Sequence, residues 1–270
     1  MSENPAKDFG AIADDYSFFE RHATEAREDV RAYAEELRGL LPAAGVVRML
    51  DYGCGTGTFT ARFLDELGWP SERVALTLVE PVDAVRRQAV ERLASRSGTP
   101  IVESAALPGE GAGPFDVILA NHVFYYVPNL RAELAKLIGS LAVQGTFVTA
   151  IAGRSNALIQ FWIAAFRELG REVPYHVAED LERALQELGA SYAKRTVAYE
   201  LAFEDSEANR MQILRFLVAD YLQLLPREFL LGLFDRYCRA GRVEVRTASE
   251  HFAVRSGKMN KGSPEWGLAY

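Results

Sequence analysis

The sequence predicts an α/β fold, a doubly wound and mainly parallel sheet with an N-terminal helix and a late helical insertion. Three observations support this prediction. Short apolar runs alternate with helical patterns over residues 46–153, and a glycine-rich turn follows the first run. Apolar residues between 18 and 41 recur every three or four positions, which is the period of an amphipathic helix. Strands that alternate with helices form parallel sheets through right-handed crossovers.

Each predicted element has a local signal. The first helix starts near Phe18 and is stopped by Pro42. Continuous apolar and β-branched runs predict buried strands at 46–52, 74–80, 101–102, 115–120 and 145–153. Apolar residues at helical spacing predict helices at 58–67, between Pro81 and Gly98, and at 130–141, 157–169 and 178–189.

The later part of the chain combines two strands with a helical segment. Residues 191–203 and 243–255 have strand character, and a helical stretch at 207–239 separates them. We expect this stretch to form a lid over the carboxyl ends of the sheet. The predicted parts are a helical cap (1–45), a central core (46–153), the remaining strands with the lid 207–240 (154–256), and a disordered tail (257–270).

Composition narrows the function classes. The chain has 270 residues, a net charge of −7 and a pI of about 5.3, which disfavours a nucleic-acid binder with a basic stripe. The two cysteines, Cys54 and Cys238, imply no disulfide framework and no cysteine-rich metal site. No apolar signal core and no membrane-length run is present. We therefore expect a cytoplasmic protein that uses no metal and binds neither membranes nor nucleic acid.

The stretch VVRMLDYGCGTGT (46–58) predicts a ligand-binding turn, because Gly53, Gly55 and Gly57 allow close approach to the backbone. A dinucleotide fingerprint counted from Gly53 would need glycine at position 58, which is Thr58. The Gly-Lys-Ser/Thr ending of a P-loop is also absent. The pattern that remains, acid-x-Gly-x-Gly-x-Gly with Asp51 as the acid, resembles motif I of the class I S-adenosylmethionine-dependent methyltransferases.

This resemblance implies a seven-stranded Rossmann-like methyltransferase sheet, with 46–153 as its cofactor-binding core. It also implies that S-adenosylmethionine binds with its carboxylate at the glycine N–H groups and its cationic end facing Asp51. Glu80 ends the second strand and is expected to bind the ribose hydroxyls, although a solvated acid at a helix start is an alternative. Tyr16, in FGAIADDY, is expected to close over the cofactor or to pack at a helix entry.

Two further cofactor contacts are predicted at strand ends. Ser104 follows the third strand, where it could hydrogen-bond the adenine or be an ordinary strand-end serine. Asn121 and His122 leave the fourth strand at the carboxyl edge of the sheet, where open α/β folds bind ligands. We expect Asn121 to contact the cofactor. His122 is a candidate for proton transfer, or a packing residue.

Several segments, read in order, resemble the histamine N-methyltransferase group of small-molecule methyltransferases. They are FFERHATE (18–25), LVEP (78–81), FYYVPNLRAELAKLIGSL (124–141) and AGRSNALIQFW (152–162). The resemblance implies that Glu25 binds the amine-bearing substrate; without it, Glu25 reads as a helix-surface acid. Two positions depart from that group. Ala248 stands where its late substrate-binding asparagine is expected, and Ile12 stands near its early tyrosine.

Aromatic residues are predicted to line the substrate pocket. Tyr126 matches an aromatic wall of the resembled group, and Trp162 or Phe161 falls near another, with core packing as the alternative for each. Tyr125 and Tyr126 would attract a cationic centre. The Asn/Asp-Pro-Pro-aromatic motif of nucleic-acid amino-methyltransferases is absent.

The predicted function is transfer of a methyl group from S-adenosylmethionine to a small molecule by in-line displacement. The favoured acceptor is an amine nitrogen, with Glu25 and His122 as the catalytic candidates. The alternatives are a small-molecule O-methyltransferase that acts on a carboxyl or hydroxyl group, and a non-catalytic S-adenosylmethionine-binding regulator. The expected assembly is a monomer or a homodimer.

Overall fold

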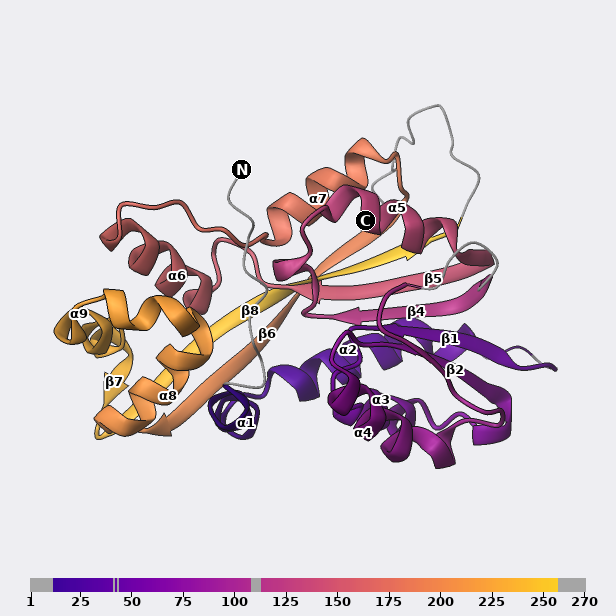
Figure 1. Cartoon of the computed structure of the whole chain (residues 1–270), viewed down its shortest axis with the longest axis horizontal. Helices are drawn as coiled ribbons and strands as arrows, with labels where there is room; N and C mark the ends of the chain where they lie inside the picture. Colours follow the sequence, from indigo (N-terminus) through magenta and orange to yellow (C-terminus); the bar gives the residue numbers. More distant parts are fainter. Residues whose placement is uncertain (1–11, 41, 43, 108–112, 257–270) are drawn as a thin grey trace, which may run out of the picture.

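A computed structural model describes residues 12–40, 42, 44–107 and 113–256, and it contains one twisted sheet (Figure 1). The neighbouring strands, in order, are β3 (Val102–Ser104), β2 (Val74–Val79), β1 (Val47–Tyr52), β4 (Phe115–Asn121), β5 (Leu141–Ile151), β8 (Arg242–Arg255) and β6 (Tyr192–Glu204). Pairing is parallel from β3 to β5 and antiparallel between β5, β8 and β6. A short strand, β7 (Cys238–Arg239), adds to β8. The predicted fold class is confirmed.

Helices cover both faces of the sheet, as a doubly wound fold requires (Figure 1). On one face, α2 (Glu25–Leu37), α3 (Thr58–Leu67) and α4 (Asp83–Leu93) bury one apolar core with β1 and β2. On the other face, α5 (Leu130–Gly139), α6 (Ala157–Glu168) and α7 (Ala178–Glu187) belong to a second and larger core. The carboxyl ends of β1, β2 and β4 therefore meet along one edge between the two layers.

The first helix is broken, which corrects the single helix predicted over 18–41. α1 (Ala13–His22) ends where Ala23 becomes extended and forms a β-bridge with Leu201 of β6. The backbone N–H of Thr24 donates to the carbonyl of Glu200, and the Thr24 hydroxyl accepts from the N–H of Glu200. These bonds to β6 replace the helical ones, so a new helix, α2, starts at Glu25. Apolar periodicity alone does not reveal such a break.

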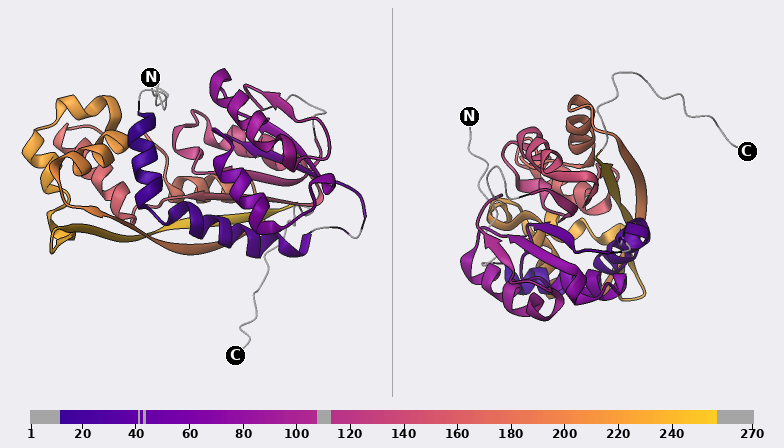
Figure 2. Two further views of the ribbon diagram at one scale, coloured as in Figure 1. Left: turned by 90° about the horizontal axis from the view of Figure 1, so that it is seen from below. Right: turned by 90° about the vertical axis from the view of Figure 1, so that its right-hand side faces the viewer.

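The late helical segment is also broken into shorter pieces. α8 (Glu207–Val218) ends at Ala219, whose φ is 42°, and Pro226 precedes α9 (Arg227–Gly232). In the left view of Figure 2 the block of α8 and α9 lies at one end of the molecule, and α1 lies between it and helices α3 and α4. Arg215 of α8 forms an ion pair with Asp15 of α1. Closure of this block as a lid stays a prediction, and the predicted tail 257–270 lies outside the described residues.

Within the described ranges, no helix has the length and apolar character needed to cross a membrane.

Candidate active site

The glycine turn leaves room for a ligand at one of its three glycines. Gly53, Gly55 and Gly57 have φ of 78°, 53° and 74°, the left-handed region that favours glycine. A Cβ on Gly53 would lie 2.5 Å from a methyl group of Val123, and one on Gly57 would lie 3.1 Å from Cα of Ala89. A Cβ on Gly55 would meet nothing within 4 Å. Gly53 and Gly57 are therefore needed for packing, whereas Gly55 faces open space.

The start of α3 lies directly after this turn and has no side-chain cap. Its first N–H groups and the positive end of the helix dipole are therefore available to an anionic group. A glycine that faces open space beside an uncapped helix start fits the carboxylate end of S-adenosylmethionine.

Two acids flank the turn at the ends of β1 and β2. Asp51 is 3% exposed and accepts a hydrogen bond from the Thr60 hydroxyl. Burial raises the pKa of Asp51 to about 7, although the hydrogen bond from Thr60 acts in the opposite direction. Glu80 is half-buried, and its Oε1 accepts from the backbone N–H of Val82 at 2.9 Å. Both acids lie beside the glycine turn, as predicted, and their contacts with the cofactor stay predictions.

The other predicted cofactor residues already have partners within the protein. The Ser104 hydroxyl donates to the carbonyl of Ala106 at 2.6 Å. Asn121 accepts from the Tyr33 hydroxyl at 2.8 Å and donates to Oδ2 of Asp29 at 3.3 Å. Tyr16 is 38% exposed and contacts the ring of Phe216 at 5.4 Å. The structure thus turns the Asn121 amide toward α2, and the cofactor contacts of all three residues stay predictions.

Glu25, Asp29, His122 and His251 form a buried polar cluster between α2 and the sheet, in which Asp29 and His251 are almost fully buried and the side chains of Glu25 and His122 stay 13% and 18% exposed. Nε2 of His122 donates to Oδ2 of Asp29 at 3.1 Å and lies 3.6 Å from Oε1 of Glu25. Nε2 of His251 donates to Oδ1 of Asp29 at 2.8 Å. Among the described residues, no group of three or more His, Cys, Asp or Glu side chains is arranged to hold a metal ion. The cluster is therefore a set of ion pairs and hydrogen bonds.

Strand register and helix spacing explain how this cluster forms. Asn121 of β4 pairs with Ala150 of β5, which pairs with His251 of β8, so the three residues form one row across the sheet. The backbone N–H of His122 donates to the carbonyl of Ala150, and its φ of 55° turns the chain at that point. Glu25 and Asp29 are four positions apart on α2, so both face the same row.

Charge in the cluster is set by the pairing of its members. Burial alone would lower the pKa of His122, but the Glu25 charge and the bond to Asp29 raise it to about 9. Burial would likewise raise the pKa of Asp29, but hydrogen bonds and charge from His122 and His251 lower it to about 2. Burial raises the pKa of Glu25; His122 opposes this rise and Asp29 adds to it. At neutral pH, His122 is therefore an imidazolium and Asp29 a carboxylate.

Aromatic side chains lie beside the cluster. The Tyr125 hydroxyl accepts from the backbone N–H of Ala152 at 2.7 Å and lies 3.0 Å from Nδ1 of His122. The Tyr125 ring meets Trp162 edge-on at 5.5 Å, and Tyr126 meets Tyr175 at 5.1 Å. The indole N–H of Trp162 donates to the carbonyl of Leu217 in α8 at 2.8 Å. Trp162 is thus a buried packing residue, while Tyr126 is half-buried; substrate contacts by these aromatic residues stay predictions.

Glu25 and His122 are both site residues predicted from the sequence, whereas Asp29 and His251 were not predicted. Two partners of Glu25 were not predicted either. They are the Ser249 hydroxyl, which donates to Oε1 of Glu25 at 3.2 Å, and Tyr199, a further hydrogen-bond partner. The four-residue spacing of Glu25 and Asp29 was the available signal. It placed both acids on one helical face without showing that this face is buried against β8.

A family model described as "Methyltransferase domain" matches residues 18–194, well over half of the chain. The chain belongs to the methyltransferase domain family. This match confirms the prediction of a methyltransferase domain.

Curated relatives of this methyltransferase include two proteins named trans-aconitate 2-methyltransferase from strains of Rhodopseudomonas palustris. One is 30% identical over 54% of this chain and 54% of its own length, and the other is 32% identical over 49% and 46%. The chain thus spans about half the length of the curated relatives it matches. These names do not bear out the resemblance to the histamine N-methyltransferase group, which stays a prediction.

Similar solved structures support the fold. The YcgJ protein from Bacillus subtilis has a TM-score of 0.56 at 13% identity, covering 83% of this methyltransferase and 98% of its own chain. The plantazolicin methyltransferase BpumL, solved in complex with SAH, has a TM-score of 0.52 at 14% identity and covers 93% and 91%. At such identities the likeness extends to the fold alone.

Proposed function

We propose that this methyltransferase transfers the methyl group of S-adenosylmethionine to an amine nitrogen of a small molecule. The observation that carries the proposal is the position of Glu25, 3.6 Å from the His122 ring at the carboxyl edge of β4. Glu25 and Asp29 are two carboxylates against one imidazolium. The buried polar cluster is therefore negative overall when Glu25 is ionised and His251 is neutral, which favours an ammonium-bearing acceptor over an anionic one.

The chemistry assigned to Glu25 is proton removal from the acceptor. S-Adenosylmethionine supplies an electrophilic methyl group on a sulfonium, and an ammonium has no lone pair with which to attack it. The ammonium proton would pass to the Glu25 carboxylate. The freed nitrogen would then form the N–C bond as the C–S bond breaks and its electron pair returns to sulfur. Burial, which raises the pKa of Glu25, makes it a stronger base than an exposed glutamate.

The cofactor end of the site is assigned to the glycine turn. The backbone at Gly55 and the uncapped start of α3 would hold the carboxylate of S-adenosylmethionine, and Glu80 would hold its ribose hydroxyls. Methyl transfer then depends mainly on alignment of the acceptor and on exclusion of water. The aromatic side chains beside the His122 ring would exclude water from the acceptor.

A second candidate is O-methylation of a carboxylate, which the names of the curated relatives favour. A groove of about 1050 Å³ between α5, α6 and α7 is consistent with it. Arg154, Arg167 and Arg171 line this groove, together with Tyr175, whose ring also contacts Tyr126. An acceptor with several carboxylates would be attracted by these arginines.

The deciding experiment is an assay of S-adenosylhomocysteine release over panels of amines, imidazoles, carboxylic acids and phenols. The amine proposal expects turnover of at least one amine, with one proton released from the ammonium for each methyl group transferred to its nitrogen. Turnover confined to carboxylic acids, without proton release, would establish the second candidate instead. Tight cofactor binding with no acceptor in any panel would favour the non-catalytic regulator.

A further inference from the structure

We propose that Asp29, supported by His251, is the positioning residue of the acceptor site. It fixes the His122 ring and keeps it protonated, so that Glu25 is the group left to meet the acceptor. This inference rests on the proposed function, because it gives Glu25 its role. The sequence motifs do not include Asp29, and its assignment comes from the geometry of three elements, α2, β4 and β8.

Asp29 has the contacts of a fixed anchor. It is 1% exposed, and both of its oxygens accept hydrogen bonds. Oδ1 accepts from His251, and Oδ2 accepts from His122 at 3.1 Å and from the Asn121 amide at 3.3 Å. The Tyr33 hydroxyl, one turn further along α2, holds the other end of that amide at 2.8 Å. Breaking this set would leave a buried charge without partners, which is among the costliest changes in a protein interior.

These bonds determine where the protons of both histidines lie. An ionised carboxylate only accepts, so Nε2 of His122 and Nε2 of His251 must each carry a hydrogen. Nδ1 of His122 faces the Tyr125 hydroxyl, which already accepts from Ala152. When His122 is an imidazolium, both of its ring nitrogens donate and the ring cannot turn without losing both bonds.

Several titratable groups of the described residues influence the protonation of His122. Glu25 and Asp29 face it from α2, and Tyr125 faces it from the turn after β4. His251 of β8 acts through Asp29, and Tyr199 of β6 acts through Glu25. The two carboxylates are the charged groups nearest to the ring. Asp29 is the closer of the two and the one that hydrogen-bonds the ring, so its removal should lower the protonation of His122 even though the Glu25 charge remains.

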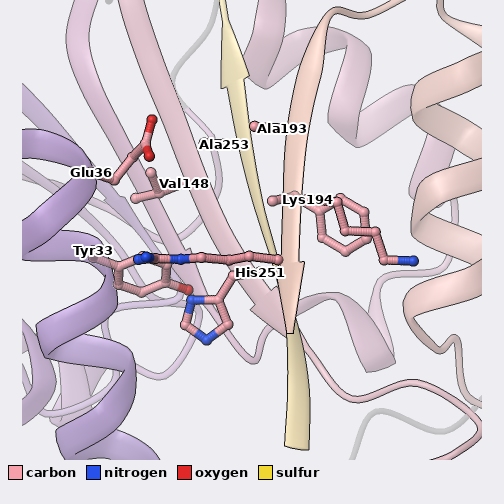
Figure 3. A pocket seen from close by; sticks show the side chains of 9 residues that line it. Tyr33, Glu36, Val148, Ala193, Lys194, His251 and Ala253 are labelled. Atoms are coloured by element: carbon pink, nitrogen blue, oxygen red, sulfur yellow. The ribbon is translucent and has the colours of Figure 1, made fainter. Parts of the chain in front are cut away.

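His251 supports Asp29 through a single ring donor, Nε2. Its Nδ1 is buried and makes no hydrogen bond with the described residues. The ring forms part of the wall of a cavity of about 60 Å³, next to the ring of Tyr33 at 4.9 Å (Figure 3). A cavity of that size, lined also by Glu36 and Arg195, has room for a water molecule. With Nε2–H committed to Asp29, His251 therefore needs no second charge to act as a donor.

The test measures the protonation of His122 directly, by nitrogen-15 NMR of histidine-labelled protein. The chain has four histidines, so single substitutions can assign every ring. In the wild type, both His122 nitrogens should be protonated at pH 7.5, and Nε2 of His251 should carry a proton. In Asp29→Asn, the His122 midpoint should fall by more than one pH unit toward the ordinary value of about 6.5. An unchanged midpoint would overturn the proposal.

Two further variants keep the result interpretable. His251→Gln retains a donor to Asp29 and should shift the His122 midpoint less than Asp29→Asn does. A larger shift would mean that His251, and not Asp29, is the main support of the His122 ring. Glu28→Gln changes an acid of the same helix that pairs with Arg27 and Arg31, and it should leave the His122 spectrum as in the wild type. If Asp29→Asn fails to fold, His251→Ala removes the donor to Oδ1 of Asp29 altogether, and an unaltered His122 midpoint in that variant would count against the proposal.

Kinetics then separate this inference from the proposed function. With an amine acceptor, Asp29→Asn should lower kcat by about tenfold or more while the KM for S-adenosylmethionine changes little, and its pH profile should shift with the His122 midpoint. Because the NMR measurement needs no acceptor, it stands even if the enzyme methylates only carboxylates. That outcome would remove the proposed function and leave the effect of Asp29 on His122 intact.

Discussion

Oε1 of Glu25 lies 3.6 Å from Nε2 of His122, although Glu25 begins helix α2 and His122 follows strand β4. The Ser249 hydroxyl of β8 donates to the same Glu25 oxygen at 3.2 Å. Three elements thus hold one carboxylate in place at the edge of the sheet where ligands bind in open α/β folds. This arrangement gives the central prediction about the acceptor.

Glu25→Gln should lower kcat/KM for an amine acceptor by about 10²-fold or more, because an amide cannot remove the ammonium proton. The amide oxygen can still accept from Ser249, so the fold should be retained. Turnover of a carboxylate acceptor, which needs no base, should change little. The measurement is S-adenosylhomocysteine release, with Glu28→Gln as the matched control on the same helix. Full amine activity in Glu25→Gln would remove Glu25 from the mechanism.

Stability should depend on pH through His122. Its folded pKa of about 9 is raised above the ordinary value of about 6.5, so its contribution is complete below pH 6.5 and is lost as the pH rises through 9. Thermal unfolding between pH 6 and 10 should therefore show a falling melting temperature for the wild type. His122→Gln, with no group to titrate there, should show a flatter curve. Parallel curves for the two proteins would mean that His122 is not held as an imidazolium.

The pH dependence of stability that Asp29 contributes has the opposite sign. Its folded pKa of about 2 lies below the ordinary value of about 3.9, so its contribution is present above pH 3.9 and is lost as the pH falls through 2. Acid unfolding of the wild type and of Asp29→Asn should therefore converge as the pH approaches 2. A stability difference between them that stays constant from pH 6 to pH 2 would contradict the pairing of Asp29 with the two histidines.

The sheet and the glycine turn could be predicted from the sequence because their signals are local. Apolar runs, helix periods and the spacing of Gly53, Gly55 and Gly57 each lie within a dozen residues. The buried polar cluster could not be predicted in full. Asp29 and His251 meet only because α2 crosses the row formed by β4, β5 and β8, and no local pattern encodes that register. The break at Ala23 has the same cause, since β6 supplies its partners.

The attachment of α8 to the core is tested at Trp162. Its indole N–H donates to the Leu217 carbonyl in a buried setting, so Trp162→Phe leaves that carbonyl unpaired. The expected loss is about 1–3 kcal/mol in the free energy of unfolding, with faster hydrogen exchange along α8. Trp69→Phe, which also removes a buried indole, controls for lost ring area and should leave exchange in α8 unaltered. Equal exchange in α8 of both variants would show that this bond does not anchor the helix.

Two glycines of the turn are expected to differ in role, with Gly53 needed for packing and Gly55 for ligand binding. Alanine at Gly53 or Gly55 would lower the stability of the folded state by about 1–2 kcal/mol, because φ is positive at both positions. At Gly53 the added methyl also collides with Val123, whereas at Gly55 it projects into open space. Gly53→Ala should therefore lower the free energy of unfolding in urea more than Gly55→Ala. Gly55→Ala should instead weaken S-adenosylhomocysteine binding, measured by calorimetry, by about tenfold or more, since its methyl would occupy the space assigned to the ligand carboxylate. Wild-type affinity in Gly55→Ala would place the cofactor away from this turn.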